Sequence, residues 1–501
     1  MGDTEKDTGA YQSVAPSQEV RGEDSSNEIE TRPPQQKLDR YISFIPAIAF
    51  NANLQATWES VAVSFQAGLL NGGPTSLVWG SLIAWIGSMA MAASLAEMAS
   101  MNPTVGAQYR WTSMFAPPRV LSPAFWGLLQ GWITVFAWIA TCAQPAFLLA
   151  TVIQGMIVLT DASYVYERWH GTLLAWALFA IPVVINIFAR RVLPGLEVVG
   201  VVTHLLFFVI WIVVLAVMAP KSSAEFVFAT NSFGISGWSN QGVQWCVGLL
   251  SAVFPLGGFD GVLHMSDEVK DAPRKVPLSM VYGLAINGAM SFAFMICILF
   301  CLGDPEEALN TPTGYPIIQV VYNATGSKGA TIALLSFLTF NGMIAMFSSL
   351  ASVSRLTWAF ARDHGLPFSQ FFGAVHPTLR IPLNSLMLVS AVIVLLQLIN
   401  IGSSTALFAI LGVSTIGLYM SYILPILFIL LTKLRTPESI RYGPFRLPAA
   451  PGLVINAFAV VYGVFILIWL PFPPFMPVTG VNASLSLSHY TRPGVTGSIV
   501  S

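Results

Sequence analysis

The strongest constraint on the fold is an apolar stretch over residues 241–264 that contains Phe-Pro-Leu-Gly-Gly-Phe-Asp-Gly at residues 254–261. A helix that crosses a bilayer must satisfy its backbone hydrogen bonds internally, and Pro and Gly interrupt them. Irregular backbone at membrane depth is tolerated only inside protein or beside a water-filled cavity, and a carboxylate such as Asp260 is costly there. A broken helix that carries an acid is typical of the substrate or ion site of a secondary transporter.

The composition also indicates a membrane protein. The chain is 55% hydrophobic and only 9% charged, whereas soluble domains carry about 25% charged residues. Its net charge of −1 argues against nucleic acid as a partner. The sequence contains no His-Glu-x-x-His helix, no Gly-x-Ser-x-Gly elbow and no nucleotide-binding loop. We therefore expect neither an enzyme nor an ATP-driven pump, and no cofactor or metal site.

Apolar runs long enough to cross a bilayer recur along the chain, because a helical span needs roughly 20 residues. Eleven runs meet this length, and they define an all-α, multi-pass membrane protein. The expected spans are 43–70, 75–98, 122–157, 170–189, 194–219, 241–264, 279–303, 329–354, 383–401, 404–432 and 451–471.

The first span repeats the anomaly of the sixth, since residues 43–70 exceed a straight crossing and contain Gln-Ala-Thr-Trp-Glu-Ser at residues 55–60. Two interrupted helices five spans apart predict a ten-helix core of two inverted five-helix repeats, with a site where the breaks meet. The predicted units are a disordered cytoplasmic tail, two repeats, an eleventh span and a short polar tail. Their bounds are 1–40, 41–219, 241–432, 451–471 and 472–501.

Loop charges predict the orientation, because cytoplasmic loops are enriched in Lys and Arg. With a cytoplasmic N-terminus, the outer loops hold only Arg168, Lys221 and Lys328. The sequons at Asn323 and Asn482 then lie outside as possible glycosylation sites. We expect the plasma membrane, with the vacuolar membrane as the alternative. The inner basic residues are Lys37, Arg40, Arg110, Arg119, Arg190, Arg191, Lys270, Arg274, Lys275, Arg355, Arg362, Arg380, Lys433, Arg435, Arg441 and Arg446.

Three segments carry a family resemblance. Residues 264–277 read His-Met-Ser-Asp-Glu-Val-Lys-Asp-Ala-Pro-Arg-Lys-Val-Pro, which resembles a signature of amino acid–polyamine–organocation permeases. Leu-Ala-Glu-Met at 95–98, followed by residues 103–109, and the segment 354–367 resemble the same family. The details are most similar to the fungal amino acid, γ-aminobutyrate and choline permeases. The resemblance implies the ten-helix inverted-repeat core and uptake coupled to protons.

Two departures from that family stand out. Relatives often carry a Gly-Ser-Gly-like triplet in the first helix, whose backbone amides receive a substrate carboxylate, but this chain has Thr-Trp-Glu-Ser at residues 57–60. Relatives also usually have a twelfth span, whereas the sequence after Pro477 is polar and rich in Ser.

The candidate site combines both breaks. Asp260 and Glu59 are expected to provide counter-charge and to couple substrate to protons, and aromatic faces beside them would suit an ammonium group. For Asp260 a structural ion pair remains the alternative, for Trp58 a position facing lipid, and His204 is interpreted as a core histidine. The predicted substrate-binding residues are Ala56, Thr57, Trp58, Glu59, Ser60, Gly257, Gly258, Phe259 and Asp260.

The predicted function is therefore secondary active import of amino acids or related small amines, coupled to protons. The partners are the amine-bearing substrate, protons and the lipid bilayer. Choline, γ-aminobutyrate and polyamines remain open as substrates. A nutrient sensor that binds without transporting is the alternative from another functional class.

Overall fold

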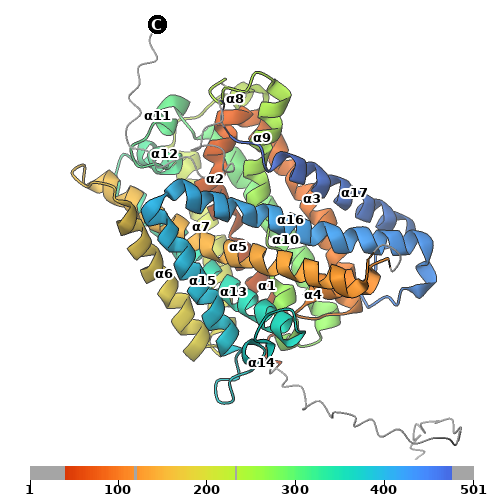
Figure 1. Cartoon of the computed structure of the whole chain (residues 1–501). Coiled ribbons are helices and arrows are strands. Elements are labelled where there is room, and N and C mark those ends of the chain that lie inside the picture. Colours follow the sequence, from red (N-terminus) through yellow and green to blue (C-terminus); the bar gives the residue numbers. More distant parts are fainter. Residues whose placement is uncertain (1–39, 118–120, 232–233, 475, 477–501) are drawn as a thin grey trace, which may run out of the picture. The chain divides into compact units, whose positions relative to one another are not determined.

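The computed structural model describes residues 40–117, 121–231, 234–474 and 476. Among these residues, ten helical segments are long and apolar enough to cross a membrane. They are α3 (Gly73–Met101), α5 (Pro123–Thr160), α6 (Arg168–Phe188), α7 (Leu193–Met218), the segment Gln241–Glu268, α10 (Ala272–Phe300), α13 (Lys328–Arg362), α15 (Leu383–Gly402), the Gly412–Arg435 part of α16 (Ser404–Arg435) and α17 (Ala449–Trp469) (Figure 1).

The first predicted span is present as two short helices, α1 (Phe44–Gln55) and α2 (Thr57–Asn71). Neither is long enough to cross alone, but they join directly through Ala56, whose backbone is left-handed with φ of 41° and ψ of 55°. A non-glycine residue rarely adopts this conformation. Together with the ten longer segments, this pair accounts for the eleven predicted spans.

The sixth span is also broken, as predicted. Helix α9 (Gln241–Val253) continues into the short 3₁₀ helix η1 (Phe254–Leu256), and a second 3₁₀ helix, η2 (Gly261–Glu268), follows after four residues. Gly258 lies between them with φ of +79°, a conformation that favours glycine. The prediction of an all-α, multi-pass fold with discontinuous first and sixth helices is confirmed.

Helix packing supports the two-repeat architecture. Helix α3 packs against α10, α5 against α13 and α6 against α15. Thus the second, third and fourth spans of one half each contact their counterpart in the other half. The bounds of the two repeats stay a prediction, and the predicted tails at 1–39 and 477–501, which include Asn482, lie outside the described residues.

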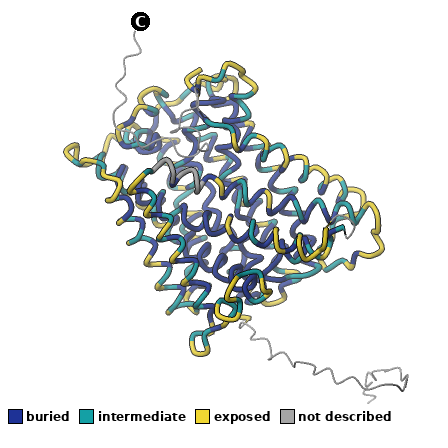
Figure 2. The backbone as a smooth tube through the Cα atoms, in the orientation of Figure 1, coloured by how far each residue is buried: buried dark blue, intermediate teal, exposed yellow. Residues whose placement is uncertain are grey.

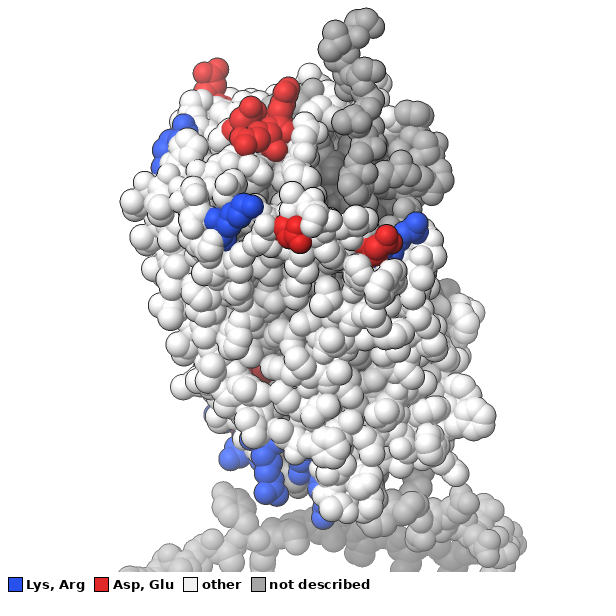
Figure 3. Space-filling model, turned by 90° about the vertical axis from the view of Figure 1, so that its left-hand side faces the viewer, with Lys and Arg blue, Asp and Glu red and all other residues white. Residues whose placement is uncertain are grey.

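The surface has the charge distribution of a protein embedded in a bilayer. Buried residues line the inner faces of the helices, and exposed ones gather at the loops (Figure 2). In Figure 3 a wide, nearly uncharged band separates one end with Lys and Arg from the other end, where Asp and Glu are mixed with Lys and Arg. We call the first the basic end and define it by Arg110, Arg190, Lys270, Arg274 and Arg380. Three short helices lie at the opposite end: α8 (Ala224–Ala229), α11 (Pro305–Leu309) and α12 (Pro316–Thr325).

The contact between α3 and α10 depends on a glycine. A Cβ atom added to Gly288 would lie 2.1 Å from atoms of the Trp85 ring. We expect Gly288→Val to destabilise the protein by roughly 1–3 kcal/mol, because an overpacked interface must shift side chains and backbone. Thermal unfolding of the purified protein in detergent measures the effect. Gly402→Val is the control, since no atom lies within 4 Å of its added Cβ, and equal losses in both variants would contradict the prediction.

Candidate functional site

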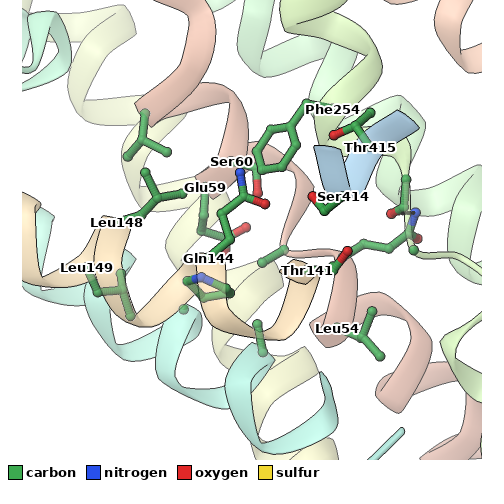
Figure 4. Close-up of a pocket in the computed structure, with 18 of the residues that line it drawn as sticks. Leu54, Glu59, Ser60, Thr141, Gln144, Leu148, Leu149, Phe254, Ser414 and Thr415 are labelled. Carbon is green, nitrogen blue, oxygen red and sulfur yellow. Dashed lines mark hydrogen bonds between the residues drawn. The ribbon is translucent and has the colours of Figure 1, made fainter. Parts of the chain in front are cut away.

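A cavity of about 100 Å³ lies where the two broken helices meet. One water requires roughly 10–15 Å³ on this measure, so the space suits several waters or a small metabolite. Its walls come from α1, α2, α5, the break after α9, α13 and α16 (Figure 4). The lining residues are Leu54, Gln55, Ala56, Glu59, Ser60, Val63, Thr141, Gln144, Pro145, Leu148, Leu149, Val152, Phe254, Gly257, Gly258, Leu338, Gly342, Ala345, Ser414, Thr415 and Leu418.

The cavity extends away from the basic end. On α2, which runs from the break towards the opposite end, it contacts Glu59, Ser60 and Val63. On α5 it contacts the second half, over residues 141–152, and on α13 it contacts the first half, over residues 338–345. Since α5 leaves the basic end and α13 returns to it, all these positions lie on the same side of the breaks.

Glu59 is the acid in the cavity wall. Its Oε1 accepts hydrogen bonds from Asn341 Nδ2 at 2.8 Å and lies 2.8 Å from His204 Nδ1. Its Oε2 is buried and has no hydrogen-bond partner in the structure. A buried carboxylate oxygen without a partner is costly. Glu59 therefore has one oxygen that is positioned by the protein and one that has no protein partner.

His204 lies behind Glu59 on α7. Its Nδ1 faces the Glu59 carboxylate, and its Nε2 lies 3.2 Å from Asn287 Oδ1. The orientation of the Asn287 amide follows from its Nδ2, which donates to the backbone oxygen of Ala52 at 3.0 Å. Both ring nitrogens of His204 thus face oxygen acceptors, an arrangement that a doubly protonated imidazolium satisfies.

Thr57 and Trp58 point away from the cavity. The Trp58 side chain is fully buried and its Nε1 donates to the backbone oxygen of His204 at 3.2 Å. Its ring packs against Phe294 with centroids 5.2 Å apart. Thr57 Oγ1 donates to the backbone oxygen of Asn287 at 3.0 Å. These two residues attach α2 to α7 and α10 and so hold Glu59 in place.

Asp260 lies inside the second break, is fully buried and is surrounded by hydrogen-bond donors. Tyr422 OH donates to Oδ1 at 2.6 Å, and Gln108 Nε2 and Trp138 Nε1 donate to Oδ2 at 2.5 Å and 3.1 Å. His264 Nε2 lies 3.4 Å from the same oxygen. The carboxylate thus joins α5, α16, η2 and the short helix α4 (Ala107–Phe115), and it does not line the cavity.

The structure therefore divides the nine predicted substrate-binding residues into two groups. Ala56, Glu59, Ser60, Gly257 and Gly258 line the cavity, whereas the other four lie behind its wall. The ring of Phe259, one of these four, packs against Tyr422 with centroids 4.7 Å apart.

The sequence did not predict the polar residues that line the cavity outside the two helix breaks. These residues lie on apolar helices, and a single polar residue in such a helix does not reveal which way it faces. They are Thr141, Gln144, Ser414 and Thr415.

The basic end is closed beneath this site. Arg355 Nε pairs with Glu268 Oε1 at 2.8 Å, and both side chains are 1% exposed. The backbone nitrogens of Tyr41 and Ile42 each donate to the backbone oxygen of Glu268 at 3.0 Å, and Lys270 N donates to the backbone oxygen of Ile42 at 2.9 Å. Burial and the nearby Glu268 carboxylate raise the pKa of the Tyr41 phenol well above its usual range.

Of the two predicted glycosylation sites, only Asn323 lies among the described residues. It is exposed near the C-terminus of α12, on the side of the molecule opposite the basic end. Its Nδ2 donates to Glu307 Oε2 at 2.9 Å. Among the described residues, no group of three or more His, Cys, Asp or Glu side chains is placed to hold a metal ion.

Comparison with known proteins agrees with this architecture. A family model described as "Amino acid permease" matches residues 42–491. A protein of Macrophomina phaseolina described as a "Putative amino acid/polyamine transporter" is 31% identical over 87% of this chain and 95% of its own length. The choline transporter of Saccharomyces cerevisiae is 31% identical over 89% and 78%, and the GABA-specific permease of the same yeast is 28% identical over 87% and 76%. The chain is therefore a membrane transporter rather than an enzyme, and it belongs to the amino acid permease family of the amino acid–polyamine–organocation superfamily.

Proposed function

We propose that the protein is a secondary active transporter that imports a small amine-bearing substrate together with protons. The observation that carries this proposal is the Glu59 Oε2 atom, which is buried in the cavity wall without a hydrogen-bond partner. An ammonium group in the cavity would donate to this oxygen and neutralise its charge. A charged hydrogen bond of this kind contributes about 1.5–3 kcal/mol.

The remaining wall favours a primary amine over a quaternary ammonium. Phe254 is the one aromatic residue among the described lining residues, whereas recognition of choline-like groups uses several aromatic faces. A primary amine can instead donate hydrogen bonds, which Glu59 accepts. The lining residues also include no Lys, Arg or His, so a substrate carboxylate would bind to neutral donors such as Gln144, Thr141 and Thr415. Amino acids and γ-aminobutyrate are therefore the favoured substrates, and choline is the second candidate.

Glu59 and His204 supply the link to protons. The pair exchanges a proton with water in the empty site, and a bound ammonium competes with the histidine for the Glu59 carboxylate. Because each cation changes the binding free energy of the other, movement of substrate and proton becomes coupled. A coupling role for Asp260, the other predicted coupling acid, stays a prediction. Both of its carboxylate oxygens already accept hydrogen bonds from protein donors, so we assign the coupling to Glu59 and His204.

An uptake panel in a permease-deficient yeast tests the proposal. Radiolabelled amino acids, γ-aminobutyrate, choline and a polyamine are offered at acidic and at neutral external pH. We expect accumulation of a primary amine that increases at acidic pH and collapses when a protonophore is added. Choline uptake without amino acid uptake would favour the second candidate. Binding to the purified protein without uptake by cells or proteoliposomes would identify a sensor and contradict the transporter proposal.

A further inference from the structure

Glu197 is a buried acid for which the proposed transport cycle has no role. It lies one turn inside α7 from the basic end and is 1% exposed. His204 follows seven residues later, so the two side chains share a face of the helix and lie about 10 Å apart along its axis. Glu197 is therefore placed between the Glu59–His204 pair and the basic end.

Its surroundings differ from those of the other buried acids. Among the described residues, four other carboxylates are equally buried, and each has a basic partner: His204 for Glu59, Lys433 for Glu97, His264 for Asp260 and Arg355 for Glu268. Glu197 forms no ion pair with any described Lys, Arg or His. Its partners are neutral. Asn53 Nδ2 donates to Oε2 at 2.8 Å, and Ser348 Oγ donates to Oε1 at 2.8 Å.

The described helices around Glu197 offer no ion-pair partner to compensate an ionised carboxylate. Asn53 faces it from α1, and Ser348 faces it from α13. Among the described residues of α10 and α12, the other helices packed on α7, no charged side chain forms an ion pair with Glu197. An ionised group without a partner in a membrane interior is expensive, and such groups mark ion or proton pathways.

The contacts suit a group that gains and loses a proton. A serine hydroxyl can donate or accept. When Glu197 is ionised, Ser348 donates to it. When Glu197 is protonated, the acid can donate to Ser348 Oγ, and that hydroxyl can donate to the Ile344 backbone oxygen, which lies 3.3 Å away. The Asn53 amide presents an N–H group rather than an oxygen, so the site favours a proton over a sodium ion.

The Glu197 side chain also contacts α1, one of the helices that line the substrate cavity. Asn53 Nδ2 bonds both the carboxylate and the backbone oxygen of Glu197, the latter at 2.7 Å, and Asn53 lies one turn before the Ala56 break. A Cβ atom added to the neighbouring Gly200 would lie 2.6 Å from Asn53 Nδ2, which shows how closely α7 approaches α1 here. The charge on Glu197 thus bears directly on the position of α1.

We propose that Glu197 is a second proton-binding site, on the basic side of the Glu59–His204 pair, which binds a proton during transport and releases it at the basic end. The proposal rests on the proposed function. On binding, a bond of hydronium breaks and an O–H bond forms on the carboxylate, and on release the proton returns to water. No other reactant takes part.

Glu197→Gln is the direct test, because glutamine imitates the protonated acid. Its amide can donate to Ser348 Oγ and its carbonyl can accept from Asn53, so the variant should fold. We expect substrate exchange between equal concentrations, measured in proteoliposomes, to stay close to wild type. Net accumulation driven by a proton gradient should fall roughly tenfold or more, the size of a typical coupling free energy. Gradient-driven accumulation with unchanged pH dependence would overturn the proposal.

A second measurement does not depend on a known substrate. Infrared difference spectra of the purified protein in lipid vesicles are recorded between acidic and alkaline pH. We expect a carboxylic acid band in the wild type that is absent in Glu197→Gln and shifts its pH midpoint in Ser348→Ala. Ser336→Ala, which removes an exposed hydroxyl bonded within the same helix, is the control and should leave the band unchanged. Identical wild-type and Glu197→Gln spectra, or a band that responds to sodium at constant pH, would overturn the proton site.

If the proposed function fails, wild-type vesicles show no substrate uptake at any pH, while the infrared result still decides whether Glu197 titrates. If only the second site fails, the wild type transports with protons and Glu197→Gln behaves identically. The two outcomes are therefore distinguishable.

Discussion

Glu59→Gln is expected to weaken substrate binding roughly tenfold to a hundredfold and to remove its dependence on pH. The substitution keeps the size of the side chain, and its carbonyl oxygen can still accept from Asn341. It places an amide N–H group at one of the two carboxylate oxygen positions, and Oε2, the oxygen without a partner, belongs to a residue that lines the cavity. A substrate ammonium would then meet a donor instead of an acceptor, and His204 would lose its counter-charge. Radioligand binding and uptake across a pH series measure both effects.

Ser60→Ala is the matched control for Glu59→Gln. Ser60 is the next residue in the cavity wall, but it is neutral. Loss of one neutral hydrogen bond contributes about 0.5–1.5 kcal/mol, so its effect should stay within roughly tenfold, with the pH dependence retained. If Glu59→Gln binds and accumulates substrate like the wild type, Glu59 is not the amine partner and the proposed mechanism is wrong.

Asp260→Asn is expected to have the second large effect, a loss of stability together with a loss of transport. Both oxygens of Asp260 accept from donors, Tyr422 on one side and Gln108 and Trp138 on the other. Asparagine replaces one carboxylate oxygen with an NH2 group. At least one of the three buried donors then faces another donor instead of an acceptor. Each such group costs about 1–3 kcal/mol. Thermal unfolding in detergent and uptake in proteoliposomes measure the two losses.

The same variant distinguishes a structural role of Asp260 from the coupling role predicted from sequence. If Asp260 couples protons to substrate, Asp260→Asn should remain stable and continue to exchange substrate while losing gradient-driven accumulation. If it mainly holds the break in place, binding, exchange and stability should fall together. Tyr422→Phe is the companion variant, because it removes the donor to Oδ1 and leaves the carboxylate charge unchanged. Retained stability in both variants would contradict the structural role.

The sequence alone predicted the broken helices and both acids, because each is a local anomaly. Pro255, the neighbouring glycines and a carboxylate within an apolar run are visible without any knowledge of the fold. The partners of the acids were not predictable in this way. Tyr422 is 162 residues from Asp260, and Asn341 is 282 residues from Glu59. Only the packing of α13 and α16 brings them to the breaks.

The direction in which a side chain points within a break was also not predictable from the sequence. Trp58 and Glu59 are neighbours in sequence, yet one packs between α7 and α10 and the other lines the cavity. The left-handed backbone of Ala56 sets where α2 starts and therefore which side each residue faces. Nothing in an alanine signals that conformation, whereas the glycine at 258 does. The sequence indicates a core position for His204, because it does not reveal the partners of its ring on α2 and α10.

The pairing of Ile42 with Val269 has a consequence for the order of events in transport. This isolated parallel bridge ties the chain just before α1 to the end of η2, which belongs to the other broken helix. If the cavity opens towards the basic end, either the two broken helices move together or the bridge between Ile42 and Val269 separates first. Because the bridge lies only a few residues from the amino-terminal segment in sequence, a factor that pulls on that segment would be expected to change how often the basic end opens, without contacting the substrate.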